Sequence, residues 1–380
     1  MKENPQFEAI STLVGTVIGA GVLGIPYLIA KAGLLNGIVL IIVLGIALTV
    51  LYLYYGEIIL RTKKLHQISG YAEKYLGKWG KLVATISFII SMYGALIAYL
   101  FGSGAALASI FGGSSLLFSL GFFFVGAVFI YIGIKAVERS EPVLMVVVMF
   151  LMMVICFLNL RHIRPEHLTG FRLDTLLIPY GLVLFALLGT NAIPEMREEL
   201  VGNEKKLKKC ILIGMAIPII IYILFSVVVV GVVGLEGFEA LDENSRIATI
   251  ALIPYVGANM AIIGNLFAVF AMSTSFLSVG LSLKEMFIFD LHLNPKLAML
   301  LTFLPPMIPF LFRLTSFIEV LEIMGVAVGG ITAFLLIFMF WNAKKHGERK
   351  PEYSLNPNPW IGWLILGLVL LGTIYSLVAF

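Results

Sequence analysis

The chain has 380 residues, of which 60% are hydrophobic and only 13% charged, and its mean hydropathy is +1.03. Soluble domains carry about 25% charged residues, so this composition excludes a soluble globular protein. Apolar stretches of about 20 residues, the length that a helix needs to cross a bilayer, recur along the chain and leave no room for a soluble signalling domain. The two cysteines, Cys156 and Cys210, form neither a disulfide framework nor a metal motif. The sequence therefore predicts an all-α polytopic membrane protein with a single transmembrane domain, 1–380.

Eleven apolar runs are expected to be membrane spans. The long run at 250–283 has room for a tilted or partly cytoplasmic end, and three prolines leave the limits of the run at 296–312 open. A basic loop with a short amphipathic helix precedes the third span, and a polar cytoplasmic linker, 342–358, precedes the last. In chain order the runs are 7–30, 34–60, 82–110, 116–134, 142–160, 175–200, 210–235, 250–283, 296–312, 316–341 and 359–379.

The distribution of basic residues gives the expected orientation in the cell membrane. If the N-terminus is cytoplasmic, 20 of the 26 lysines and arginines fall in inside segments and 6 in outside segments. Cytoplasmic loops of membrane proteins carry the excess of such residues. We therefore expect a cytoplasmic N-terminus and, with eleven spans, an external C-terminus.

Residues 18–26, IGAGVLGIP, contain glycines in the G-x-G-x-x-G spacing of dinucleotide-binding proteins. That motif requires a preceding strand and an acidic residue about 20 positions further on. Here the glycines lie inside an apolar run, and no Asp or Glu occurs between Glu8 and Glu57. The motif therefore does not indicate a nucleotide site.

Two other interpretations of these glycines stay open. Gly15 and Gly19 form a small-residue surface on which two helices can pack closely. Alternatively the helix breaks at Gly19–Ala20–Gly21, because glycine is unfavourable inside a helix and Pro26 follows soon after. A broken helix at membrane depth is tolerated where it lines a cavity.

The second half of the chain contains a similar interruption. Gly189, Thr190 and Asn191 interrupt the run at 175–200, and Pro194 follows. The spans divide into two similar halves, 7–160 and 175–341, and each half opens with an interrupted helix. This pattern is typical of inverted-repeat transporters, here with five spans in each repeat and one extra helix at 359–379.

The stretch GTVIGAGVLGIPYLIAKAG resembles the first span of the amino acid/auxin permease group and of the bacterial aromatic amino acid permeases. These proteins belong to the amino acid–polyamine–organocation superfamily with the LeuT-type fold. FALLGTNAIPEM in the sixth span and Glu57, late in the second, fit the same resemblance, which covers spans one to ten.

The resemblance implies secondary transport of an amino acid, whose charged groups meet the backbone exposed at the two breaks. Half-helix ends carry partial charges, so a zwitterion can be held there without charged side chains. Phe185 is a candidate lid over the substrate, while ordinary packing is the alternative for Phe185 and Tyr93. The expected substrate-binding residues are Gly19, Ala20, Gly21, Ser91, Tyr93, Phe185, Gly189, Thr190 and Asn191.

The stretch AMSTSFLS in the eighth span fits the A-x-x-T-S pattern that LeuT-type symporters use for one sodium ion. Sodium prefers several hard oxygen ligands, as calcium does. The alternative is that these hydroxyls bond back to their own helix. By this resemblance the candidate sodium ligands are the span-one carbonyls of Gly15 and Ile18 together with Ala271, Thr274 and Ser275.

Proton coupling is the alternative to sodium and requires a titratable group within the membrane. Glu195 follows the second break and is the stronger candidate, with a gating ion pair as its other possible role. Glu57 lies four residues from Arg61 and has the alternative of simply pairing with a cation. A lysine in the fifth span, which replaces sodium in some relatives, does not occur in this sequence. No cofactor and no nucleic acid partner are expected.

We therefore expect an ion-coupled symporter for a neutral amino acid, aromatic or branched, that works by alternating access. The absence of clustered nucleophiles, metal ligands or paired carboxylates argues against a membrane enzyme. Two broken helices in inverted halves favour a carrier over a channel, which needs rings of pore-lining groups. A membrane sensor that binds an amino acid without moving it is the remaining alternative.

Overall fold

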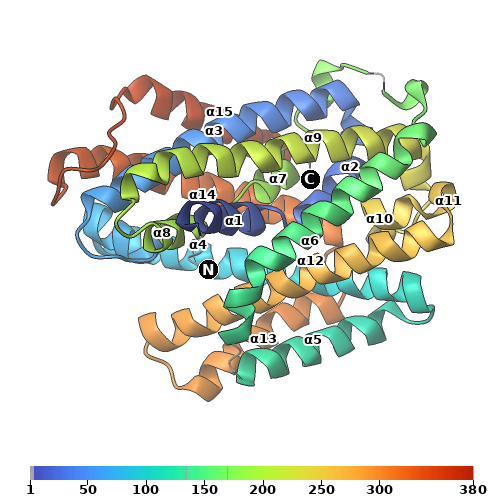
Figure 1. Cartoon of the computed structure of the whole chain (residues 1–380), viewed down its shortest axis with the longest axis horizontal. Coiled ribbons are helices and arrows are strands. Elements are labelled where there is room, and N and C mark those ends of the chain that lie inside the picture. The colour runs from blue at the N-terminus through green and yellow to red at the C-terminus, as the bar shows by residue number, and fades with distance from the viewer. Residues whose placement is uncertain (1–3, 133–134, 169, 380) are drawn as a thin grey trace.

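The computed structural model describes residues 4–132, 135–168 and 170–379, and its regular elements there are helices (Figure 1). Within these residues, seven helices are long and apolar enough to cross a membrane, or eight if one bent pair counts as a single span. The structure thus confirms the predicted all-helical, multi-pass class.

The helices fall into two sets by length. The long ones are α3 (Leu34–Arg61), α4 (Ile68–Phe111), α5 (Ser115–Ile132), α6 (Lys135–Asn159), α9 (Leu207–Glu239), α12 (Ala258–Glu285), α13 (Pro295–Leu311), α14 (Phe317–His346) and α15 (Pro359–Ala379). The short ones are α1 (Pro5–Val17), α2 (Gly21–Ala32), α7 (Tyr180–Ala186), α8 (Ala192–Glu199), α10 (Ala248–Ala251) and α11 (Ile253–Val256).

Local sequence signals explain several helix ends. The Ser316 side chain accepts the Glu319 N–H while the Glu319 carboxylate accepts the Ser316 N–H, which is a capping box at the start of α14. Asn294 caps α13, whose first residue is Pro295. Between α2 and α3, Gly33 has a φ of 97°, and a Cβ on it would lie 2.6 Å from the Gly170 carbonyl oxygen. Only glycine meets both demands without strain.

Both predicted helix breaks are present. The axes of α1 and α2 are inclined by 53°, and residues 18–20 separate them. α7 ends at Ala186 and α8 begins at Ala192, so residues 187–191 form the second interruption. Each break therefore exposes the end of one half-helix and the start of another.

One sequence expectation needs correction, and two others take a definite form. The run at 250–283 is not one span, because α10 and α11 precede Gly257, whose φ of 79° ends the helical path before α12 begins. The amphipathic segment expected at 68–81 is helical, and Gly77, with a φ of 74° and a ψ of −166°, divides α4 into two helices at a kink there. The run at 296–312, whose limits the sequence left open, corresponds to α13, and its three prolines do not interrupt that helix. The end of the run predicted at 116–134, residues 133–134, lies outside the described residues.

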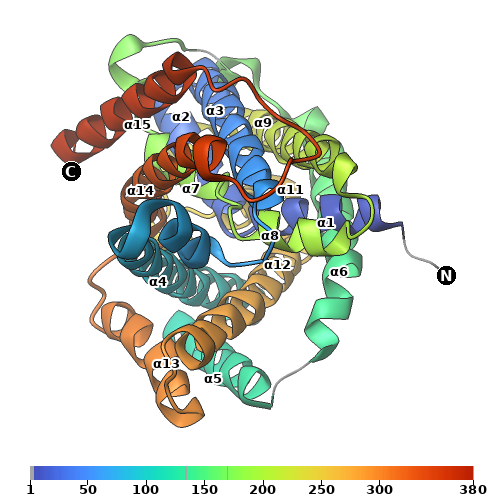
Figure 2. The ribbon, with the colours of Figure 1, turned by 90° about the vertical axis from the view of Figure 1, so that its left-hand side faces the viewer.

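The packing places the two breaks in the middle of the bundle. α4 packs against α14, α12 and α5, and α14 also packs against α7. Seen end-on in Figure 2, α15 lies at one edge of the bundle and α5 and α13 lie at another. The short helices α1, α2, α7 and α8 therefore meet between the long ones.

Candidate functional site

A cavity of about 120 Å³ lies where the α1–α2 break faces the α7–α8 break; we call it the central cavity. α4, α12 and α14 supply its other walls, with side chains such as Ser87, Met92, Val279 and Thr332. None of the described residues that line it is charged. The structure brings eight of the nine predicted substrate-binding residues to this cavity, namely Gly19, Ala20, Gly21, Ser91, Phe185, Gly189, Thr190 and Asn191.

Tyr93 is the ninth predicted residue, and the structure does not place it with the others. Its hydroxyl donates a hydrogen bond of 2.6 Å to the Leu301 carbonyl oxygen on α13. Residues two apart on a helix point to different sides, so Ser91 and Tyr93 do not share a face of α4. Tyr93 therefore joins α4 to α13 outside the central cavity.

Two fully buried tyrosines hold the backbone of the breaks from behind. The Tyr222 hydroxyl, on α9, lies 2.7 Å from the Val17 carbonyl oxygen and 3.0 Å from that of Ala186. The Tyr52 hydroxyl, on α3, donates to the Leu187 carbonyl at 2.9 Å and accepts the Gly189 N–H.

Sequence reasoning missed both of these tyrosines. A tyrosine in an apolar helix carries no local sign of its hydrogen-bond partner, and Tyr222 lies 205 residues from Val17 in the chain. The available signal was the need of a buried phenol for a partner, which does not say where that partner lies.

A second cavity, of about 100 Å³, holds the five predicted sodium ligands Gly15, Ile18, Ala271, Thr274 and Ser275; we call it the cation cavity. Ser11, Thr12, Thr16 and Ser278 add further hydroxyls to its lining. This set of uncharged oxygen donors is the type that a hard cation prefers.

Two hydroxyls of the cation cavity also donate hydrogen bonds to the backbone of their own helix, which was the alternative role considered for them. Thr274 Oγ1 and Ser275 Oγ each donate to the Ala271 carbonyl at 3.0 Å, which leaves the lone pairs of both hydroxyls for a cation. Ser11 Oγ is buried in this region and makes no hydrogen bond within the described part of the chain. The residues present therefore fit a small monovalent cation.

Tyr99 of α4 lines both cavities. A Cβ built on Gly19 would lie 3.7 Å from the Tyr99 hydroxyl and 3.6 Å from Ser275 Oγ. The same phenol thus stands between the α1–α2 break and the hydroxyls of α12.

Glu195 lies beside the central cavity and not in it. A third cavity, of about 260 Å³, contains Glu195 and Glu285 and shares Ile68, Phe88 and Asn191 with the central cavity; we call it the vestibule. The Glu195 side chain is exposed there. The Glu195 carboxylate is therefore placed to contact a solute or ion that moves between the vestibule and the central cavity.

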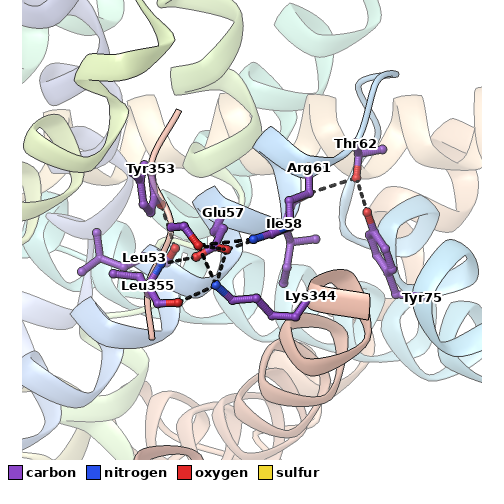
Figure 3. Close-up of polar contacts among 10 residues, drawn as sticks. Leu53, Glu57, Ile58, Arg61, Thr62, Tyr75, Lys344, Tyr353 and Leu355 are labelled. Carbon is purple, nitrogen blue, oxygen red and sulfur yellow. Dashed lines mark hydrogen bonds and ion pairs between the residues drawn. The ribbon is translucent and has the colours of Figure 1, made fainter. Parts of the chain in front are cut away.

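Glu57 lines none of these three cavities. Its carboxylate is fully buried and pairs with Arg61 at 2.8 Å and with Lys344 of α14 at 2.6 Å (Figure 3). The backbone N–H of Leu355 donates to its second oxygen at 2.6 Å. The Tyr353 hydroxyl donates to the Leu53 carbonyl nearby. Glu57 therefore fastens residues 347–358, here called the strap, to the end of α3.

Comparison with known proteins gives consistent matches over almost the whole chain. The profile of the tryptophan/tyrosine permease family matches residues 2–378. The chain is 32% identical to tyrosine-specific transport system 1 of Haemophilus influenzae, over 97% of this chain and 96% of that protein. It is 26% identical to tyrosine-specific transport system 2 of the same organism, over 100% and 97%. It is 23% identical to glutamine transporter 2 of Aliivibrio fischeri, over 96% of each chain.

Proposed function

Since the chain belongs to the tryptophan/tyrosine permease family, a family of transport proteins and not of enzymes, we propose that it is an ion-coupled symporter of a neutral aromatic amino acid. L-Tyrosine is the first candidate, because two of the relatives are tyrosine transport systems. The coarser statement, that the chain is a multi-pass amino acid transporter, follows from the family and the helices together.

The uncharged central cavity between the two breaks is the observation that carries this proposal. The first N–H groups of α2 have no partner within the helix and carry partial positive charge, which suits an α-carboxylate. The last carbonyls of α1 and α7 carry partial negative charge, which suits an α-ammonium group. Phe88, Met92 and Phe185 offer apolar contacts to an aromatic side chain.

The arrangement proposed for the membrane is the LeuT-type one. Residues 7–160 and 175–341 form two inverted repeats of five spans, 342–358 is a cytoplasmic linker, and 359–379 is an eleventh span. The N-terminus is cytoplasmic and the C-terminus external. The two helix breaks support this, as does the position of Tyr52 and Tyr222, each on the first long helix after a broken pair.

The conformation is proposed to face the cytoplasm. The central cavity shares Ile68, Phe88 and Asn191 with the vestibule, whose lining begins at Gln67 beside the basic α3–α4 loop. At the other end α7 meets α14 backbone to backbone, since a Cβ on Gly325 would overlap the Gly181 carbonyl. We assign the closed external gate to this contact.

Uptake into proteoliposomes tests the proposal. Labelled L-tyrosine is offered under an inward sodium gradient, an inward proton gradient or no gradient, with each of the twenty amino acids as competitor. Accumulation under one ion gradient, with competition by aromatic amino acids, is the expected result. A protein that binds L-tyrosine but shows neither accumulation nor counterflow is a sensor and overturns the proposal.

Thr274→Ala is expected to reduce sodium-driven uptake and to raise the sodium concentration for half-maximal uptake about tenfold, because one hydroxyl ligand of the cation cavity is lost. Ser273→Ala is the matched control, since Ser273 Oγ donates to Val269 and does not line the cation cavity. If uptake never depends on sodium, this site is rejected and Glu195→Gln becomes the variant to test for proton coupling.

Tyr93→Phe is expected to leave the KM for uptake unchanged, because its hydroxyl contacts Leu301 and not the central cavity. The lost hydrogen bond is expected to lower the free energy of unfolding by about 1 kcal/mol. Thermal unfolding in detergent and uptake kinetics measure the two effects. A several-fold rise in KM would contradict this prediction and would indicate that Tyr93 contacts the substrate.

A further inference from the structure

The Tyr222 hydroxyl joins the ends of two half-helices that are far apart in the chain. Val17 is the last residue of α1 and Ala186 is the last residue of α7. The hydroxyl lies 2.7 Å and 3.0 Å from their carbonyl oxygens, and the whole side chain is buried. One phenol on α9 therefore contacts both breaks at the point where each helix stops.

The partial negative charges on the Val17 and Ala186 carbonyl oxygens favour a hydrogen-bond donor between them. Carbonyls at a helix C-terminus carry partial negative charge, so two of them brought together repel each other. The phenol has one proton and donates to one carbonyl at a time. The Val17 oxygen also accepts the Gly19 N–H at 3.0 Å, so this N–H and the phenol together stabilise the close approach of the two carbonyls.

Tyr52 makes a similar contact with the second break alone. Its hydroxyl bonds to the Leu187 carbonyl and the Gly189 N–H, both between α7 and α8. It thus orders one break without linking it to the other, which makes it the natural comparison for Tyr222.

We propose that Tyr222 is a positioning residue that fixes the carbonyl ends of α1 and α7 as a pair, so that their combined partial negative charge faces the α-ammonium group of the substrate. Substrate binding then draws α1 and α7 together through one shared contact, and the two breaks respond as a unit. The ammonium part of this inference rests on the proposed function; the linkage of the two breaks does not.

Hydrogen exchange in the substrate-free protein tests the linkage. Tyr222→Phe removes the hydroxyl and keeps the ring. Amides in residues 17–21 and 187–191 are both expected to exchange about tenfold faster. Tyr52→Phe is expected to speed exchange in 187–191 alone. Tyr55→Phe is the control, because the buried Tyr55 hydroxyl makes no hydrogen bond in the described residues. Unchanged exchange at 17–21 in Tyr222→Phe, or faster exchange spread over the whole chain, overturns the linkage.

Binding of two probes tests the ammonium part. L-Tyrosine and its analogue 3-(4-hydroxyphenyl)propionate differ only at the α-carbon, where the analogue has hydrogen in place of the ammonium group and so offers no donor. Tyr222→Phe is expected to weaken L-tyrosine binding about tenfold and to leave the weaker analogue unchanged, so that discrimination between them falls. An equal loss for both probes contradicts the ammonium part. If the wild-type protein binds no amino acid, the proposed function fails while the exchange experiment still decides the linkage.

A second variant guards against misfolding of Tyr222→Phe. Replacing Tyr222 by 4-aminophenylalanine through an expanded genetic code supplies two N–H donors from one atom. Exchange at residues 17–21 and 187–191 is expected to be as slow as in the wild type or slower. Faster exchange in this variant would contradict the donor role.

Discussion

Gly21→Val is expected to abolish transport. A Cβ on Gly21 would lie 2.6 Å from the Ala186 Cβ and 2.8 Å from its Cα, and the second of these is backbone that cannot rotate away. The substitution therefore forces α2 away from α7 and separates the two breaks, in addition to filling space where the substrate carboxylate is expected. Uptake in proteoliposomes measures the effect, with protein yield and thermal unfolding measured in parallel.

Two further glycine variants separate these causes. Gly367→Val in α15 is the control for the substitution itself, since nothing lies within 4 Å of a Cβ there. A Cβ on Gly19 would make ordinary contacts of 3.6 Å with Ser275 and 3.7 Å with Tyr99. Gly19→Ala is therefore expected to raise KM while the fold is kept. Wild-type uptake by Gly21→Val would refute the proposed approach of α2 to α7 at the substrate site.

Glu57→Gln is expected to have the largest effect on stability. Its buried carboxylate forms ion pairs with both Arg61 and Lys344, whose side chains are only 16% and 13% exposed. Removing one partner of a buried ion pair costs about 3–5 kcal/mol, because the other charge stays buried. The strap is expected to loosen, so trypsin should cleave at Arg349 faster than in the wild type.

Glu73→Gln is the matched control, because Glu73 and Lys81 form an exposed pair, each 46% accessible. Such pairs contribute about 0–1 kcal/mol. Thermal unfolding and the rate of tryptic cleavage distinguish the two variants. A Glu57→Gln protein with normal stability that has lost ion-driven accumulation would show instead that Glu57 serves coupling.

The helix breaks could be predicted because their signals are local, whereas the candidate cation ligands came from the family resemblance. Glycine and proline disfavour helix wherever they occur, so IGAGVLGIP and GTNAIP marked both interruptions without knowledge of the fold. The residues of AMSTSFLS are one helical turn apart or less, so the structure brings Ala271, Thr274 and Ser275 to one cavity.

The remaining features depend on contacts between distant parts of the chain. The strap bonds to residues about 300 positions earlier, as in Leu355 with Glu57, and hydropathy shows it only as a polar linker. The assignment of Tyr93 to the substrate site failed to respect helical geometry, since Ser91 faces the cavity and Tyr93 lies two residues on. The run at 250–283 looked continuous because hydropathy does not register the left-handed backbone of Gly257.

Tyr99 lines both the central cavity and the cation cavity, so binding in one cavity is expected to affect the free energy of binding in the other. An ion beside Ser275 and an amino acid beside Gly19 would each bias the orientation of the same phenol. Linkage then requires reciprocity: the factor by which the ion tightens amino acid binding equals the factor by which the amino acid tightens ion binding. Titrations of the ion at fixed amino acid concentrations, and of the amino acid at fixed ion concentrations, should give the same coupling free energy. Tyr99→Phe should lower the values from the two titrations by the same amount.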